Sequence, residues 1–156
     1  MNPMMNQKLK AALVTTFLAG AFVTSNGIAA ASPSDYRAGM KDLVPQANAW
    51  VSDLEMTAAA ALSKPELACG DQMAELARRG VSIAADLRGT GENAPRALVS
   101  ANTQMTQSVE RMAAAAAVAC GDPAALADSV TDEKAGYNAA MLRINVFVQR
   151  SYASGR

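Results

Sequence analysis

The chain carries the tetrapeptide Ala-Cys-Gly-Asp twice, at residues 68–71 and 119–122, and these two copies contain its only two cysteines. Cysteines in identical local contexts indicate two similar turns that one disulfide can join. Neither copy has the Cys-x-x-Cys spacing of a redox centre. We therefore predict a structural disulfide between Cys69 and Cys120, and we expect the repeat to specify architecture rather than activity.

The first 31 residues have the pattern of a cleaved signal peptide. Lys8 and Lys10 give a positively charged start, residues 11–23 form an apolar core, and Ala31 ends a run of small residues that suits a signal peptidase. The apolar core is shorter than the roughly 20 residues that a membrane span needs. We predict cleavage after Ala31 and export to the periplasm or the medium, with no stable membrane anchor. Those compartments are oxidising, which favours the disulfide.

The charge balance bears on the kind of partner. The whole chain has 14 basic and 14 acidic residues, so removal of Lys8 and Lys10 with the leader leaves 12 basic against 14 acidic. A net charge near −2 gives no electrostatic reason to expect nucleic acid or an anionic membrane as a partner. We expect neither.

After the leader, residues 32–156 have the length of one domain and the pattern of helices. Alanine, the strongest helix former, dominates this part, and no stretch alternates as a half-buried strand does. The spacing predicts an all-α domain with helices over residues 35–62, 71–88, 94–120 and 123–152. Apolar residues recur at steps of four and three, which keeps them on one helix face. The expected inward positions are Tyr36, Met40, Leu43, Ala47, Trp50, Leu54, Thr57 and Ala61; Met73, Leu76, Gly80, Ile83 and Leu87; Leu98, Asn102, Met105, Val109, Met112, Ala116 and Ala119; and Leu126, Val130, Tyr137, Met141, Ile144 and Val148.

Capping residues and prolines suggest where the helices begin and bend. Ser34 is the expected N-cap of the first helix, and Pro45 should kink that helix without breaking it. Asn93 is expected to cap the third helix, with Pro95 in its first turn. Gly121 is suited to end the third helix.

Four helices with short connections pack most simply as an antiparallel bundle in up-down-up-down order. In that order the first and third connections lie at the same end of the bundle, and each holds one Cys-Gly-Asp triplet. The predicted disulfide then clips two helical hairpins together. Whether the hairpins arose by duplication stays open. Because the predicted third helix is longer than the second, we expect part of the third helix to be exposed.

Catalytic and metal chemistry find little support in the residues. The chain has no histidine, which is the commonest general base near neutral pH and the commonest transition-metal ligand. Neighbouring carboxylates such as Asp53 and Glu55 diverge on a helix. We predict no catalytic residue, no metal site and no cofactor, and we expect the protein not to be an enzyme.

An interhelical ligand pocket is the alternative function. Four residues come to comparable heights when counted from the turns, Trp50, Ile83, Met105 and Tyr137, and the predicted pocket also includes Gly80 and Asn102. Gly80 leaves space nearby and Asn102 brings an amide, so this pocket would suit a small hydrophobic ligand or haem. Copper is the other expected ligand, since methionine sulfurs are soft ligands. The structural alternative is that Asn102 fixes helix pairing and that the methionines fill the core.

A protein partner is the main functional hypothesis. Arg78 and Arg79 form a charged outer surface on the second helix, and arginine is favoured at interfaces. Charged side chains on a helix exterior also simply face water, and that alternative remains. We therefore predict an exported, non-enzymatic helical bundle that acts by protein–protein interaction, either with an unknown protein or by self-association.

Overall fold

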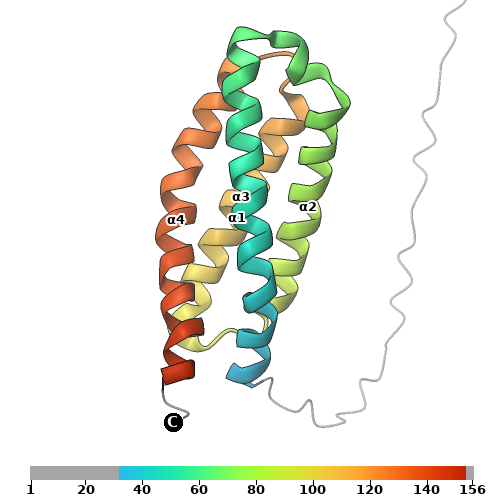
Figure 1. The fold of residues 1–156 in the computed structure, drawn as a ribbon. Coiled ribbons are helices and arrows are strands. Elements are labelled where there is room, and N and C mark those ends of the chain that lie inside the picture. Colours follow the sequence, from blue (N-terminus) through green and yellow to red (C-terminus); the bar gives the residue numbers. More distant parts are fainter. Residues whose placement is uncertain (1–31, 154–156) are drawn as a thin grey trace, which may run out of the picture.

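Four α-helices account for most of residues 32–153, the part of the chain that the computed structural model describes (Figure 1). They are α1 (Pro33–Ser63), α2 (Asp71–Gly91), α3 (Val99–Val118) and α4 (Pro123–Ala153). Short 3-10 helices lie in two of the connections, η1 at Pro65–Cys69 and η2 at Arg96–Leu98. Residues 32–153 contain no strand. The predicted signal peptide, residues 1–31, lies outside the described part.

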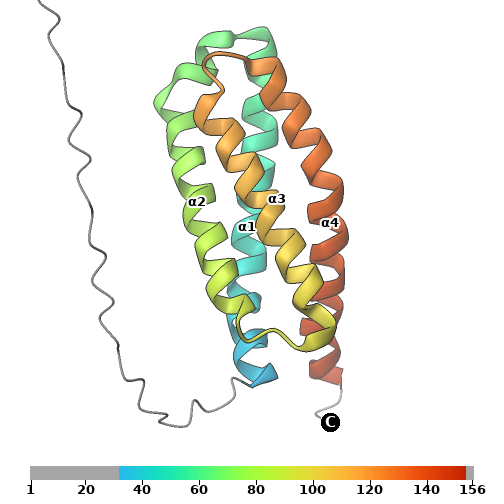
Figure 2. The ribbon, with the colours of Figure 1, turned by 180° about the vertical axis from the view of Figure 1, so that it is seen from behind.

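The helices pack in the order in which they follow one another along the chain. α1 packs against α2 and α4, and α3 packs against the same two helices from the opposite corner. The connections α1–α2 and α3–α4 lie together at one end, called here the cysteine end, and residues 92–98 form the connection at the opposite end, called the open end (Figures 1 and 2). The predicted up-down-up-down bundle is confirmed.

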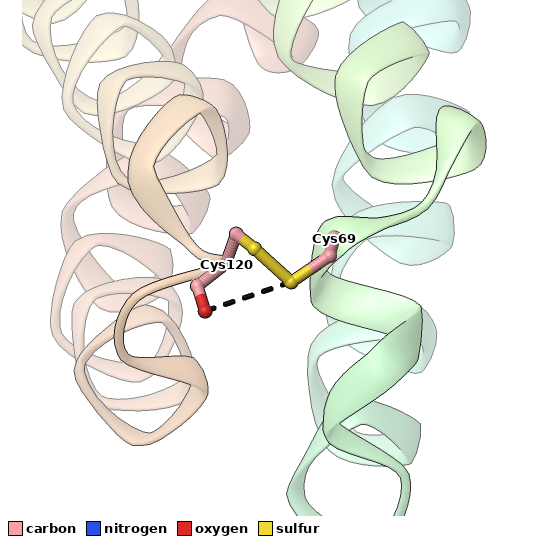
Figure 3. The surroundings of a disulfide bond; sticks show 2 residues. All are labelled: Cys69 and Cys120. Atoms are coloured by element: carbon pink, nitrogen blue, oxygen red, sulfur yellow. Dashed lines mark hydrogen bonds between the residues drawn. A yellow bond between two sulfur atoms is a disulfide. The ribbon is translucent and has the colours of Figure 1, made fainter.

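The predicted disulfide is also confirmed. Cys69 ends η1 and Cys120 lies in the turn between α3 and α4, with their Cα atoms 4.4 Å apart and their sulfurs bonded (Figure 3). The bond joins the two connections of the cysteine end, and both cysteines are exposed. The two helical hairpins, α1–α2 and α3–α4, are therefore covalently tied at one end.

The two Cys-Gly-Asp triplets nevertheless play different local roles. Gly70 is the N-cap of α2, which begins at Asp71. At the second triplet the carboxylate of Asp122 accepts a hydrogen bond from the Ala125 N–H at 3.0 Å and so caps α4. α3 ends at Val118, and no glycine of residues 32–153 has a positive φ, so the prediction that Gly121 ends α3 is wrong.

The predicted inward positions form the core. All the predicted inward positions of the first three helices are buried. On α4 they are also buried, except Met141, which is partly buried. The largest fully buried side chains include Trp50, Tyr36, Tyr137, Met40, Leu54 and Met73. The steps of four and three therefore identified the buried face of every helix.

Helix starts differ from the sequence prediction at α1. The helix begins at Pro33 with Ser32 as its N-cap, and the Ser32 N–H donates to the Asp35 carboxylate at 3.1 Å. Ser34 therefore lies inside the first turn and is not the cap. Proline suits the first helical position because its missing N–H would have no partner there. α1 continues through Pro45 without a break, as predicted.

The α2–α3 connection also differs from the prediction. α2 continues past Arg88 to Gly91, whereas α3 begins only at Val99. Pro95 has a ψ of 143°, which is extended, so a helix starting at residue 94 is not formed and Asn93 does not cap α3. α2 and α3 are 21 and 20 residues long, so the unmatched length expected for the third helix is absent.

Removal of the disulfide should lower stability without abolishing the bundle. For a bridge between cysteines 51 residues apart, the chain-entropy model predicts a contribution of about 4 kcal/mol to the free energy of unfolding. We expect the double variant Cys69→Ser, Cys120→Ser to keep its helical circular dichroism, to unfold at a lower urea concentration and to have a free energy of unfolding about 4 kcal/mol lower. Equal midpoints for the variant and the oxidised protein would contradict this role.

Candidate functional site

Trp50 occupies the space that the sequence assigned to a ligand. This side chain is fully buried, and its Nε1 donates to the backbone carbonyl of Leu76 at 2.7 Å. A Cβ atom added at Gly80 would overlap the indole of Trp50 and would lie 2.7 Å from the Cβ of Ala113. The indole from α1 therefore reaches across to α2 beside α3, and the gap at Gly80 is filled by protein.

Asn102 joins three helices near the open end. Its Oδ1 accepts a hydrogen bond from the Tyr36 hydroxyl at 3.2 Å, and its Nδ2 donates to the Leu87 carbonyl at 3.1 Å. A Cβ atom at Gly91 would lie 2.9 Å from the Asn102 amide carbon, so the backbone of α2 approaches this side chain closely. These contacts match the structural alternative, in which Asn102 fixes helix pairing.

The other residues of the predicted pocket are part of the packed interior. Met105, Ile83 and Tyr137 are buried, and the Tyr137 hydroxyl donates to Asn48 Oδ1 at 2.7 Å. Among the six residues, the structure brings Trp50 and Gly80 together, whereas Asn102 is held by Tyr36 and Leu87 instead. Burial raises the pKa of Tyr36 to about 12 and the pKa of Tyr137 further above its ordinary value.

A shallow apolar groove lies on the outer face between α2 and α3. From α2 it is lined by Ala74, Ala77, Arg78 and Val81. From α3 it is lined by Ala113, Ala114 and Ala117. We call this hollow, of about 500 Å³, the alanine groove. Val81 stands on its wall with 64% of its surface exposed, although valine is apolar.

A second, polar hollow continues along the same pair of helices toward the open end. Its volume is about 390 Å³, and Thr103, Gln107 and Glu92 are among the residues that line it. Arg88 of α2 and Glu110 of α3 also line it, and they form an ion pair across the two helices. The α2–α3 face therefore has an apolar half at the cysteine end and a polar half at the open end.

The predicted arginine surface borders this face. Arg78 lines the alanine groove, its side chain is 78% exposed, and it is paired with Glu75 on the same helix. Arg79 points instead toward α1, where it lies 3.5 Å from the Asp53 carboxylate. The structure thus places the two neighbouring arginines on different faces of α2.

The sequence did not predict that the residues of the alanine groove form a site. The alanine run at residues 113–117 predicts only a helix, and Val81 is not among the predicted inward positions of α2. The available signal was that Ala74, Val81, Ala114 and Ala117 are apolar residues at outward positions of neighbouring helices. That signal has meaning only once α2 and α3 are known to pack side by side.

Metal sites and membrane spans are absent from the described residues. Within residues 32–153, no group of three or more histidine, cysteine, aspartate or glutamate side chains is placed to hold a metal ion. None of the helices in this part is both long and apolar enough to cross a membrane. Comparison of the chain with protein-family models, curated proteins and solved structures found no match.

The contact between Gly80 and Trp50 can be tested with a pair of glycine variants. Gly80→Ala should destabilise the bundle by about 1–3 kcal/mol because its Cβ overpacks against the indole. Gly89→Ala is the matched control in the same helix, where a Cβ meets no atom within 4 Å, and it should stabilise by roughly 0.5–1 kcal/mol. Urea unfolding followed by the fluorescence of Trp50, the single tryptophan, measures both. Equal shifts for the two variants would refute the close contact.

Burial of Tyr36 predicts loss of stability at high pH. Below pH 10 the tyrosine is protonated in both the folded and the unfolded chain, so it adds no pH dependence. Between pH 10 and about 12 the unfolded tyrosine loses its proton while the folded one keeps it, so the free energy of unfolding falls as the pH rises.

Denaturant titrations at several pH values measure this slope. The variant Tyr36→Phe should show a shallower fall over the same window, with the rest contributed by Tyr137. An unchanged slope in the variant would show that Tyr36 is not the group responsible.

Proposed function

We propose that this protein is an exported, non-enzymatic four-helix bundle that acts by binding a protein partner through its α2–α3 face. The observation that carries the proposal is the alanine groove, an apolar hollow on the outside of the bundle with an exposed Val81 on its wall. Apolar surface gathered in a hollow on a protein exterior often marks an interaction site. The export part of the proposal rests on the leader pattern of residues 1–31 and on the disulfide.

The shape of the groove suits a helical or flat partner. Its floor is formed by alanine side chains from two antiparallel helices, so another backbone is able to approach closely over Ala114 and Ala117. Helices commonly bind in such grooves through apolar residues three and four positions apart. The exposed Arg78 at the border adds a residue type that is favoured in interfaces.

The groove supports a surface interaction more directly than an interior cargo. At the centre of the bundle the indole of Trp50 fills the space beside Gly80, and Asn102 already holds Tyr36 and Leu87. The buried methionines Met40, Met73, Met105 and Met112 belong to the hydrophobic core, where methionine commonly fills space. The interior therefore supports a carrier function less well than the groove supports a protein partner.

A pair of aspartate variants tests the interaction. Val81 and Leu142 are 64% and 63% exposed, so Val81→Asp and Leu142→Asp change similarly exposed apolar positions on different helices. Tagged mature protein, recovered from its own export compartment, should retain a stoichiometric protein partner. That partner is either another protein or an untagged copy of the same chain. We expect Val81→Asp to lose that partner, because the new carboxylate would be desolvated in the interface, and Leu142→Asp to keep it.

Two results would count against the proposal. Retention of the partner by Val81→Asp together with its loss in Leu142→Asp would place the interface on α4. A tightly bound chromophore, metal or small molecule in the recovered protein, with no protein partner, would favour a carrier.

A further inference from the structure

The partner that fits the α2–α3 face best is a second copy of this chain. We infer that two α2–α3 faces pack against each other across a two-fold axis, so that the alanine grooves of both copies form the centre of a dimer. The inference rests on the proposed function and gives its partner. It is supported by the charges, the size and the layout of this face.

Both arginines of the face are already paired within one copy. Arg78 pairs with Glu75, and Arg88 pairs with Glu110 across the two helices. The arginines that border the two hollows therefore do not call for an acidic partner. Apart from these pairs, Glu92 is the one charged residue that lines either hollow, so the face has little net charge and meets an identical face with little repulsion.

The net charge of the whole molecule also favours the proposed dimer. The chain has 14 basic and 14 acidic residues, and the mature part differs from balance by only two charges, 12 against 14. Proteins near zero net charge have little long-range repulsion between copies, which promotes self-association. A strongly charged foreign partner would gain little electrostatic attraction from this surface.

The size of the face is close to what a dimer requires. α2 and α3 contain 21 and 20 residues. At 1.5 Å per residue they are about 30 Å long, and two helices side by side are about 20 Å wide. The footprint is thus on the order of 600 Å² before side-chain relief is counted, against about 800 Å² of accessible surface per partner in a standard interface.

The layout follows the usual anatomy of an interface, with an apolar patch beside a polar rim. The alanine groove is the apolar part, and the hollow around Thr103, Gln107 and the Arg88–Glu110 pair is the polar part. In a two-fold dimer the same patch is used by both copies. Each copy then supplies both the projecting Val81 and the alanine floor on which the other copy packs.

The native mass of the mature chain, residues 32–156, tests the inference. Sedimentation equilibrium of the oxidised protein over a range of concentrations should give twice the chain mass. Val81→Asp and, as a second variant, Ala117→Arg should raise the dimer dissociation constant by at least about tenfold, since each introduces a charge into an apolar contact. Leu142→Asp should leave the constant unchanged, and circular dichroism should show that all variants keep their helices.

Hydrogen exchange locates the contact independently. Amides of α2 and α3 should exchange more slowly at concentrations where the dimer forms, while those on the outer side of α4 should not change. A non-reducing gel must show single chains, because a dimer held by exchanged Cys69–Cys120 bridges would overturn the inference.

The outcomes separate this inference from the proposed function. A wild-type chain that remains monomeric at every concentration overturns the second copy as the occupant. If that monomer still retains another protein in a way that depends on Val81 and not on Leu142, the proposed function stands with a foreign partner. A monomer that retains no protein overturns both. A dimer broken by Leu142→Asp and not by Val81→Asp overturns the choice of face.

Discussion

The contact of Trp50 with Gly80 sets the arrangement of the bundle at its centre. The indole extends from α1 to the backbone of α2, where its N–H is held by the Leu76 carbonyl, and it requires a residue without a side chain at position 80. Ala113 of α3 lies next to the same point. Because Ala113 also lines the outer groove, the small residues that admit the indole on the inside contribute to the hollow on the outside.

The two ends of the bundle are fixed by different chemistry. At the cysteine end the disulfide ties the α1–α2 connection to the α3–α4 connection. At the open end Asn102 links Tyr36 of α1 to Leu87 of α2. A buried polar network with its partners satisfied favours one helix pairing over others. With register fixed at both ends and at Trp50, the positions of Val81 and Ala117 relative to each other are determined by the core.

The buried faces were predictable from sequence because spacing reports burial directly, and the bridge was predictable because only one cysteine pair exists. Local boundaries were less predictable. Pro95 takes an extended conformation, which delays α3 to Val99. The sequence suggested that Gly80 leaves space near Trp50, but it did not show that the indole fills this gap. The groove was not predictable because it belongs to two helices at once, and the exposure of Ala114 beside Ala74 depends on how α2 and α3 pack.

The alanine lining bears on the proposed interface, because it also suits a surface that faces water. Alanine exposes little apolar area per residue, so an open groove lined by Ala74, Ala114 and Ala117 loses less in water than one lined by leucines would. The same small side chains let a second backbone come close, where many weak dispersion contacts add up. In the proposed interface, specificity for the partner depends on the few larger side chains around the alanine floor. These are Val81 and Arg78 at the apolar half and the Arg88–Glu110 pair at the polar half. In the proposed dimer, a contact of this composition would be reversible and sensitive to single changes at Val81, unlike the permanent contacts of the core.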